Sequence, residues 1–272
     1  FPALTGNKSV GPVVTRLDTF LSPKAVRYMV GQKANRLDFG DIMDSGKIFL
    51  AKLSHGAIGK ENSHLLGSLL VAKIQAEAMR RQKQSESARR HHFLYADEFH
   101  DFLTPSLAEC LSGARKYRLG LVLAHQEMRQ VERDSDVSSA LLGAGTRVVF
   151  RVNDRDAKSL ESGFSSFESR DIQNLETGHA ICRVERSDAD FNLAVDAPSY
   201  ADEETAHRRR ERIVALSRER YGTSRSEIEQ HLARAAEIEA PAPKLETRPV
   251  MRETPVGKTT IPPPVASPPE TN

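Results

Sequence analysis

Cysteine is scarce in this chain. Only Cys110 and Cys182 occur among 272 residues, and neither belongs to a CxxC pair. Such isolated cysteines predict neither a disulfide framework nor a zinc site. We expect both to be buried thiols in a reducing compartment.

Long apolar runs and a large net charge are also absent. No run of about 18 apolar residues occurs, so the sequence predicts no transmembrane helix, and no signal peptide is visible. The formal net charge of +2 is too small to indicate nucleic-acid binding without a local basic patch. The chain opens with Phe1 and not with Met, which is compatible with a piece of a longer protein.

Proline is concentrated at the C-terminal end. Nine of the 14 prolines follow position 240. This composition cannot bury enough apolar area to offset the entropy of ordering, so we predict a disordered tail at 239–272. A Pro-rich docking segment is the alternative. We predict an ordered part at 1–198 and C-terminal helices at 199–238.

Short apolar runs alternate with stretches of helical periodicity in the ordered part. The runs predict strands at 48–53, 93–96, 119–124, 147–152 and 178–184. Helical spacing predicts helices at 65–81, 105–117, 154–162 and 201–221, and a capping box at Ser224 opens another. The alternation predicts an α/β fold with a largely parallel sheet, covered on both faces.

Arginine is enriched in the expected helix at 201–221, where it is interleaved with glutamate. This pattern indicates a solvated, salt-bridged face, with a DNA-binding patch as the alternative. The basic residues at 80–83 and 89–90 flank a polar loop, and they favour a solvated linker over phosphate contacts.

Polar residues follow three of the expected strands. They are Ser54 and His55, Asp97 and Glu98, and His125 and Gln126. Because ligands bind beyond the carboxyl ends of parallel strands, we expect these side chains at one edge of the sheet. An apolar strand that ends in Asp-Glu is the Walker B pattern, in which Asp97 would hold Mg²⁺ and Glu98 would activate water. Gln126 is placed to contact a γ-phosphate or the water, and Arg115, on the helix between the two strands, could act across a subunit boundary.

The segment at 93–131, FLYADEFHDFLTPSLAECLSGARKYRLGLVLAHQEMRQV, resembles the motor domain of conjugative coupling proteins of type IV secretion systems. These TraG/TraD-like motors belong near the HerA/FtsK-like branch of DNA-pumping ATPases. Segments 35–75 and 145–160 extend the resemblance, which covers residues from about 7 to 196. The ordered combination of Asp-Glu, Gly-x-Arg-Lys and His-Gln carries it.

The resemblance implies a RecA-like P-loop NTPase core that uses ATP and Mg²⁺. It implies Asp97 as the Mg²⁺ residue, Glu98 as the catalytic base, Gln126 as the γ-phosphate sensor and Arg115 as an arginine finger for the next subunit. It also implies a hexameric ring around single- or double-stranded DNA, with a relaxase or secretion-channel protein as a possible partner. The expected location is the cytoplasm, or the cytoplasmic face of the inner membrane if membrane helices precede this segment.

The phosphate-binding loop of that family, G-x-x-x-x-G-K-[ST], is missing from the sequence. Gly257-Lys258-Thr259 ends as the motif does but starts at Arg252, and no strand or helix is expected around it. We expect the loop in an N-terminal half outside this segment, and the segment alone to be inactive.

Two other functions stay open on the sequence. One is a HerA-like helicase or translocase in repair or defence, and the other is a non-catalytic interaction module derived from such a motor. A metal site at His91, His92 and His100 is not expected, because adjacent strand residues point to opposite faces.

Overall fold

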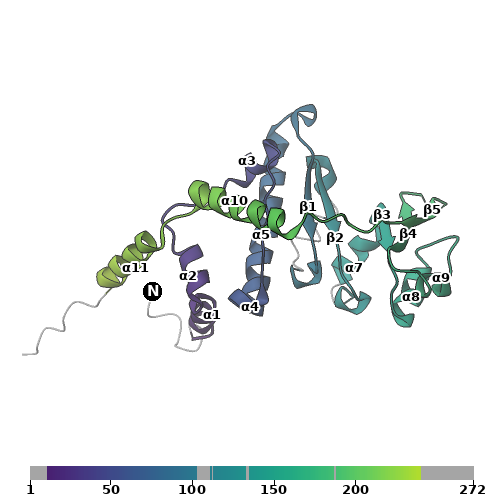
Figure 1. Ribbon diagram of the computed structural model, residues 1–272, viewed down its shortest axis with the longest axis horizontal. Coiled ribbons are helices and arrows are strands. Elements are labelled where there is room, and N and C mark those ends of the chain that lie inside the picture. The colour runs from purple at the N-terminus through teal and green to yellow at the C-terminus, as the bar shows by residue number, and fades with distance from the viewer. Residues whose placement is uncertain (1–10, 103–110, 112, 133–134, 187, 240–272) are drawn as a thin grey trace, which may run out of the picture. The chain divides into compact units, whose positions relative to one another are not determined.

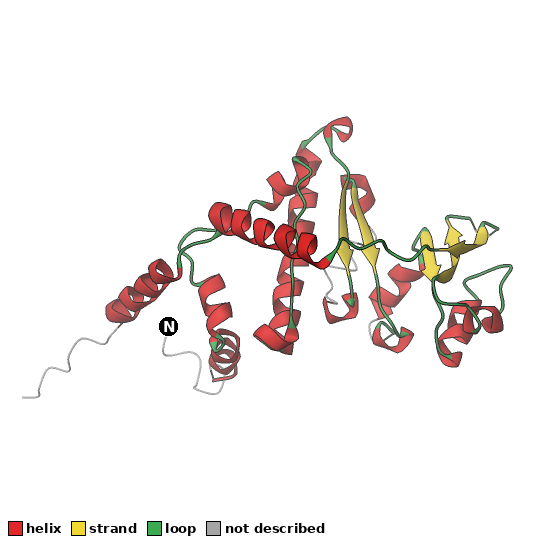
Figure 2. Cartoon of the chain, in the orientation of Figure 1, coloured by secondary structure: helices red, strands yellow, loops and turns green. Residues whose placement is uncertain are grey.

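The computed structural model describes residues 11–102, 111, 113–132, 135–186 and 188–239 (Figures 1 and 2). The chain divides into two compact units, at 1–232 and 233–272. The Pro-rich tail, most of the helix expected at 105–117, and Cys110 lie outside the described residues. Within the described ranges, no helix is both long and apolar enough to cross a membrane. The predicted domain boundaries stay predictions.

Within the described residues, five α-helices come before the first strand. They are α1 (Gly11–Leu21), α2 (Lys24–Val30), α3 (Phe39–Asp44), α4 (His55–Ile58) and α5 (Lys60–Arg80). Asp38 caps α3, because its side chain accepts a hydrogen bond from the backbone N–H of Asp41 at 3.0 Å. The helix predicted at 65–81 is confirmed as α5, although α5 begins five residues earlier, directly after the turn at Gly59.

The strand predicted at 48–53 is wrong. Residues 47–54 lie in no helix or strand. Ile48 and Leu50 are 87% and 76% exposed, whereas Phe49 packs edge-on against Phe39 with ring centroids 5.3 Å apart. The apolar run therefore anchors an extended segment through alternate side chains and makes no backbone ladder with another described strand.

The parallel pair consists of β1 (His92–Ala96) and β2 (Leu119–Leu123), in register from His92↔Leu119 to Ala96↔Leu123. Leu94 and Leu121 pack against a core that α3 and α5 supply. On the other face, Phe93, Tyr95 and Val122 are 55%, 72% and 44% exposed. Coverage of both faces, which the sequence predicted, is therefore not found within the described residues.

A second sheet contains β3 (Thr146–Val149), β4 (His179–Val184) and β5 (Asp190–Ala194), and all its pairs are antiparallel. The prediction of a largely parallel sheet is therefore confirmed only for β1 and β2. The connection between β4 and β5 is too short for the crossover that a parallel pair needs. Arg183 and Asp190 lie opposite each other, with Nε 2.7 Å from Oδ1, and this hydrogen bond lowers the pKa of Asp190.

Helices α8 (Asp154–Glu161) and α9 (Ser169–Gln173) pack on this second sheet. Their core comprises Val149, Ala157, Phe164, Ile172 and Ile181. Cys182 on β4 is a buried free thiol, as the sequence predicted. The other short elements are the 3-10 helices η1 (Arg81–Lys83), η2 (Glu86–Ala88), η3 (Phe99–Phe102), η4 (Ala114–Tyr117) and η5 (Met128–Gln130), and helix α7 (Ser135–Leu142).

Two helices close the described chain, α10 (Glu203–Tyr221) and α11 (Arg225–Glu239). No described residue of α10 is buried, so its arginines are solvated as predicted. The expected network of ion pairs is not present, because His207–Glu211 is the pair found within the described part of this helix. The start of α11 contacts α2, where the Tyr28 hydroxyl donates to Glu229 Oε1 at 2.6 Å.

Candidate functional site

The carboxyl ends of β1 and β2 are held together by backbone hydrogen bonds. The N–H of Ala124 donates to the carbonyl of Ala96 at 3.0 Å, and the N–H of Phe99 donates to the carbonyl of Ala124 at 3.1 Å. These bonds continue the pairing of the strands past their ends. The two loops that carry the polar residues therefore leave the sheet side by side.

Glu98 and Gln126 meet directly at this edge. Gln126 Nε2 donates a hydrogen bond to Glu98 Oε1. The second carboxylate oxygen of Glu98 is buried, and it has no hydrogen-bond partner among the described residues. Asp97 is exposed, and its Oδ1 accepts from the backbone N–H of Glu98 at 3.0 Å. The structure thus brings together three of the four residues that the sequence singled out.

The backbone of Glu98 lies in the left-handed region, with φ at 49°. Residues other than glycine rarely adopt this conformation, because Cβ approaches the carbonyl oxygen. The left-handed conformation of this turn therefore costs conformational energy, and the turn directs the Glu98 carboxylate toward Gln126. Such strain in a non-glycine residue at a strand end is typical of functional sites.

Arg115 does not join this group. It lies in η4, which precedes β2, so it sits at the amino end of the parallel pair, whereas Glu98 and Gln126 follow the carboxyl ends. Its side chain is exposed, with no hydrogen bond or ion pair to another described residue. Since a five-residue strand spans roughly 16 Å, Arg115 cannot act on the Glu98 of its own chain.

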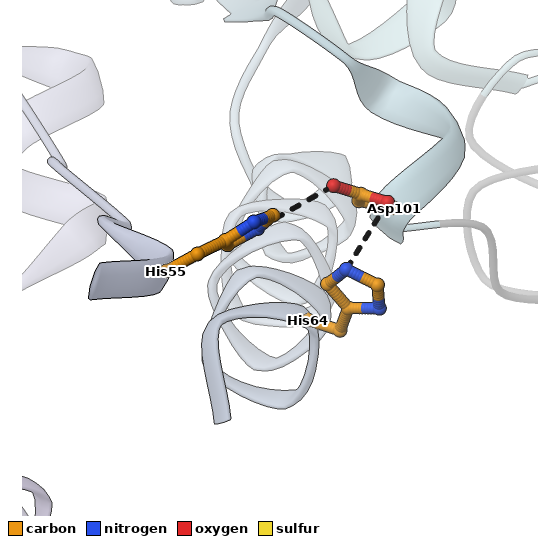
Figure 3. Close-up of side chains that lie close together, drawn as sticks. All are labelled: His55, His64 and Asp101. Carbon is orange, nitrogen blue, oxygen red and sulfur yellow. Dashed lines mark ion pairs between the residues drawn. The ribbon is translucent and has the colours of Figure 1, made fainter. Parts of the chain in front are cut away.

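A cluster of imidazoles and one carboxylate adjoins Glu98, and sequence reasoning missed most of it. Figure 3 shows three of its members, His55, His64 and Asp101. His100 Nδ1 lies 3.3 Å from Glu98 Oε2, and His100 Nε2 lies 3.4 Å from Asp101 Oδ1. His64 and His55 approach the same Asp101 carboxylate at 3.1 and 3.6 Å. The available signal was the position of His55 after an expected strand end, and nothing in the sequence pairs it with Asp101.

A hollow of about 670 Å³ borders Gln126 on the side of β3. Segments 125–128 and 148–154 line it, together with Asp156, Leu160 and Gln173. Asp156 is 3% exposed and links the two sides, because its Oδ2 accepts from the backbone N–H of Met128 at 3.2 Å. The hollow therefore lies directly beside Gln126, one of the candidate site residues.

The basic residues between α5 and β1 have structural roles. Arg81 is buried, donates to the carbonyls of Arg90 and Tyr117, and pairs with Asp44 at 2.7 Å. Arg89 donates to the carbonyls of Arg81, Gln84 and Lys116. These contacts replace the solvated linker that the sequence predicted at Arg81 and Arg89.

Of the two expected ligands, Mg²⁺ and ATP, the side chains at the strand ends fit Mg²⁺. Asp97 and Glu98 offer carboxylate oxygens, which Mg²⁺ prefers. ATP needs in addition a run of backbone N–H groups that cradles the β- and γ-phosphates. The sequence contains no such loop with a strand before it and a helix after it. These residues alone can hold a cation and direct a water molecule, but they cannot cradle a triphosphate.

Solved structures of the plasmid coupling protein TrwB are similar to this chain. For TrwB in complex with the ATP analogue ADPNP, the TM-score is 0.51 at 17% identity, over 74% of this chain and 53% of TrwB. For TrwB with ADP and Mg²⁺, the values are 0.51 and 17%, over 73% and 52%. A genome-packaging NTPase of Sulfolobus turreted icosahedral virus 2, in complex with AMPPCP, matches with a TM-score of 0.38 at 16% identity, over 48% and 63%.

No protein-family model matches the chain, and no curated protein matches its sequence. The chain spans about half the length of the TrwB structures that match most of it. At this identity the likeness concerns the fold. This chain is an α/β protein with the fold of part of the conjugative coupling protein TrwB.

Proposed function

We propose that this chain is the Walker B part of an ATP-driven, DNA-translocating motor of the conjugative coupling type. The observation that carries the proposal is the contact between Glu98 and Gln126, directly beyond the carboxyl ends of a parallel strand pair. Nucleotide hydrolysis needs an acidic residue and a polar residue at such an edge, close enough to share one water molecule. The fold likeness to a coupling protein agrees with this assignment.

Each residue has a separate role in the proposed reaction. Asp97 is exposed and would be the residue that holds Mg²⁺, an ion that would supply positive charge to the phosphates. Glu98 accepts a proton from the attacking water through Oε2, which accepts no hydrogen bond from a described residue and lies 3.3 Å from His100 Nδ1. Gln126 donates a hydrogen bond to the other carboxylate oxygen of Glu98, and in the proposed reaction it senses the γ-phosphate.

The proposed site needs a phosphate-binding loop from outside the described residues. Within them, β2 pairs with β1 alone, so its other edge is open to a further strand. The hollow borders the loop that follows β2, and the exposed apolar face includes Val122 of β2 itself. A strand and helix that bring the loop would have room to pack there.

The first test is to read the codons upstream of Phe1. An in-frame G-x-x-x-x-G-K-[ST] motif is expected, and its absence from the whole gene would contradict the catalytic proposal.

With the loop-bearing protein, Glu98→Gln should retain ATP binding and lose DNA-stimulated hydrolysis by roughly 10²–10⁴-fold, the usual worth of a general base. Phosphate release measures hydrolysis, and Glu127→Gln on the neighbouring loop is the matched control. A Glu98→Gln protein that hydrolyses ATP at the unaltered rate would remove Glu98 from the mechanism.

One observation favours a second function, a non-catalytic module derived from such a motor. The sequence lacks the phosphate-binding loop while the polar edge persists. The two functions differ in the full gene, since a module needs no loop at all. A HerA-like helicase or translocase would share the catalytic residues and lack membrane helices in the full gene.

A further inference from the structure

We propose that His55, His64 and Asp101 form a binding site for a divalent transition-metal ion of the Zn²⁺ class. The proposal is independent of the ATPase function. It rests on three side chains from three separate elements, α4, α5 and η3, that point toward one another (Figure 3).

The distances between the donor atoms suit a single small ion. Asp101 Oδ1 lies 3.1 Å from His64 Nε2, and Asp101 Oδ2 lies 3.6 Å from His55 Nε2. One donor atom from each residue can be chosen so that all three lie within 4.8 Å of one another. Ligand atoms that bind one Zn²⁺ at about 2.1 Å in tetrahedral geometry lie about 3.4 Å apart. Small side-chain rotations would therefore bring the three donor atoms to the spacing that one ion needs.

The His64 nitrogen gives a second, independent indication. His64 Nε2 is shielded from solvent, and no hydrogen bond with acceptable angles reaches it from the described residues, although Asp101 Oδ1 is 3.1 Å away. When His64 Nε2 carries no proton, it and the Asp101 oxygen both present lone pairs, and a cation between them would bind both atoms; a proton on Nε2 makes the same contact an ion pair. Buried polar atoms seldom stay without a partner, and an unobserved ion is one explanation of an exception.

The ligand types select the class of ion. Two imidazoles and one carboxylate suit Zn²⁺ and its first-row neighbours, whereas Mg²⁺ and Ca²⁺ prefer oxygen ligands. The half-exposed side chain of His55, 48% accessible, gives an ion a route from solvent. Three protein ligands leave a position for water or an exogenous group.

The backbone holds the three ligands in place. Gly59, at φ 83° and ψ 153°, makes the sharp turn between α4, which carries His55, and α5, which carries His64. Gly67, one turn of α5 after His64, lets the Phe102 ring approach so closely that a Cβ atom would lie 2.2 Å from it. This contact fixes η3, and with it Asp101, against α5.

The test is a metal titration of the untagged 272-residue chain after treatment with EDTA and dialysis. Isothermal titration with Zn²⁺ should show one equivalent bound with a Kd in the micromolar range or tighter. Co²⁺ should give visible d–d absorption at the same stoichiometry. Zn²⁺ should also raise the Tm of the unaltered chain.

Three variants locate the ion. His64→Ala, Asp101→Asn and His55→Gln should each weaken Zn²⁺ binding by more than about 10-fold, since even outer residues of metal sites contribute 10–100-fold. His207→Ala is the matched control, because His207 forms an exposed pair with Glu211 on α10. Circular dichroism in EDTA checks that each variant folds, and the half-exposed His55 is the substitution least able to disturb the fold.

Absence of saturable binding by the unaltered chain would overturn the proposal. So would binding that all three variants retain, because it would place the ion at another of the nine histidines. Equal loss in His207→Ala would show that Zn²⁺ binds the surface without a defined site.

Discussion

Two adjacent arginines have opposite environments. The side chain of Arg81 is 3% exposed and reaches Asp44 and two backbone carbonyls, whereas the side chain of Arg80 is 73% exposed and pairs with Glu77 one turn away. The first connects α3, the segment before β1 and η4, and the second covers solvent-exposed helix surface. Their sequence context, Arg-Arg, does not reveal the difference.

Arg81→Ala should therefore lower the free energy of unfolding by about 2–4 kcal/mol, because it leaves carbonyl groups without their donor and Asp44 without its cation. Arg80→Ala should change it by no more than about 0.5 kcal/mol. Urea denaturation of both variants measures the contrast. Equal effects would mean that the Arg81 contacts do not hold the loop between α5 and β1.

The left-handed backbone of Glu98 leads to a test of strain. Glu98→Gly should be more stable than Glu98→Ala by about 1 kcal/mol, since glycine adopts φ near +50° without steric cost. At Glu127, with φ at −129°, the order should be reversed. Thermal denaturation of the four variants measures these differences in stability. The same order of stability at both positions would contradict the claim that the Glu98 backbone is strained.

The placement of Glu98 and Gln126 at one edge of the sheet could be predicted because strand ends are local features that a single sequence displays. Their contact follows from the pairing of two parallel strands in register. His55 and His64 could not be matched to Asp101 in the same way. Their convergence depends on a glycine turn and on the packing of α5 against η3, both of which involve long-range geometry.

At the scale of elements, the contact between α5 and η3 depends on one missing methyl group. Gly67→Ala should lower the free energy of unfolding by about 1–2 kcal/mol, because the clash with the Phe102 ring exceeds the gain in helix propensity. Gly56→Ala on α4 has open space and should be neutral or slightly stabilising. Chemical denaturation compares the two, and a stabilised Gly67→Ala protein would show that Phe102 moves aside without cost.

The elements that the sequence predicted well have strong local signals. β1 and β2 are short apolar runs, and α8 is capped by Asn153, whose side chain accepts from the N–H of Asp156 at 3.0 Å. The strand expected at 48–53 has the same apolar character and forms no ladder among the described residues. Strand formation requires a partner edge, and an apolar run does not say which edges are available.

Antiparallel pairing in the second sheet was missed for a related reason. The sequence showed one strand at 178–184, whereas the structure adds β5 at Asp190–Ala194, a segment with two charged or polar residues in five. A half-exposed hairpin strand has a weak apolar signal. The resulting sheet is therefore antiparallel where alternating helices and strands suggested parallel units.

At the scale of the whole molecule, Arg115 and Glu98 belong to opposite ends of the parallel pair. If the proposed motor forms a ring, Arg115 serves the nucleotide of a neighbour. Arg115→Ala in the loop-bearing protein should then lower turnover by about 10³–10⁵-fold and leave ATP affinity unchanged.

Mixing provides the measurement for this arrangement. Rings that combine Glu98→Gln subunits with Arg115→Ala subunits contain some interfaces with both residues intact, so partial ATPase activity should return. Mixed rings with no activity would assign Arg115 a structural role within its own chain.

The exposed face and open edge of the β1–β2 pair have a consequence for handling the chain. Phe93, Tyr95 and Val122 form an apolar surface beside an edge of β2 that no other described strand pairs with. Open edges next to apolar surface are templates for intermolecular strand addition. The isolated chain should therefore aggregate increasingly as its concentration rises. A charged substitution such as Tyr95→Lys should delay precipitation without altering the Glu98 turn.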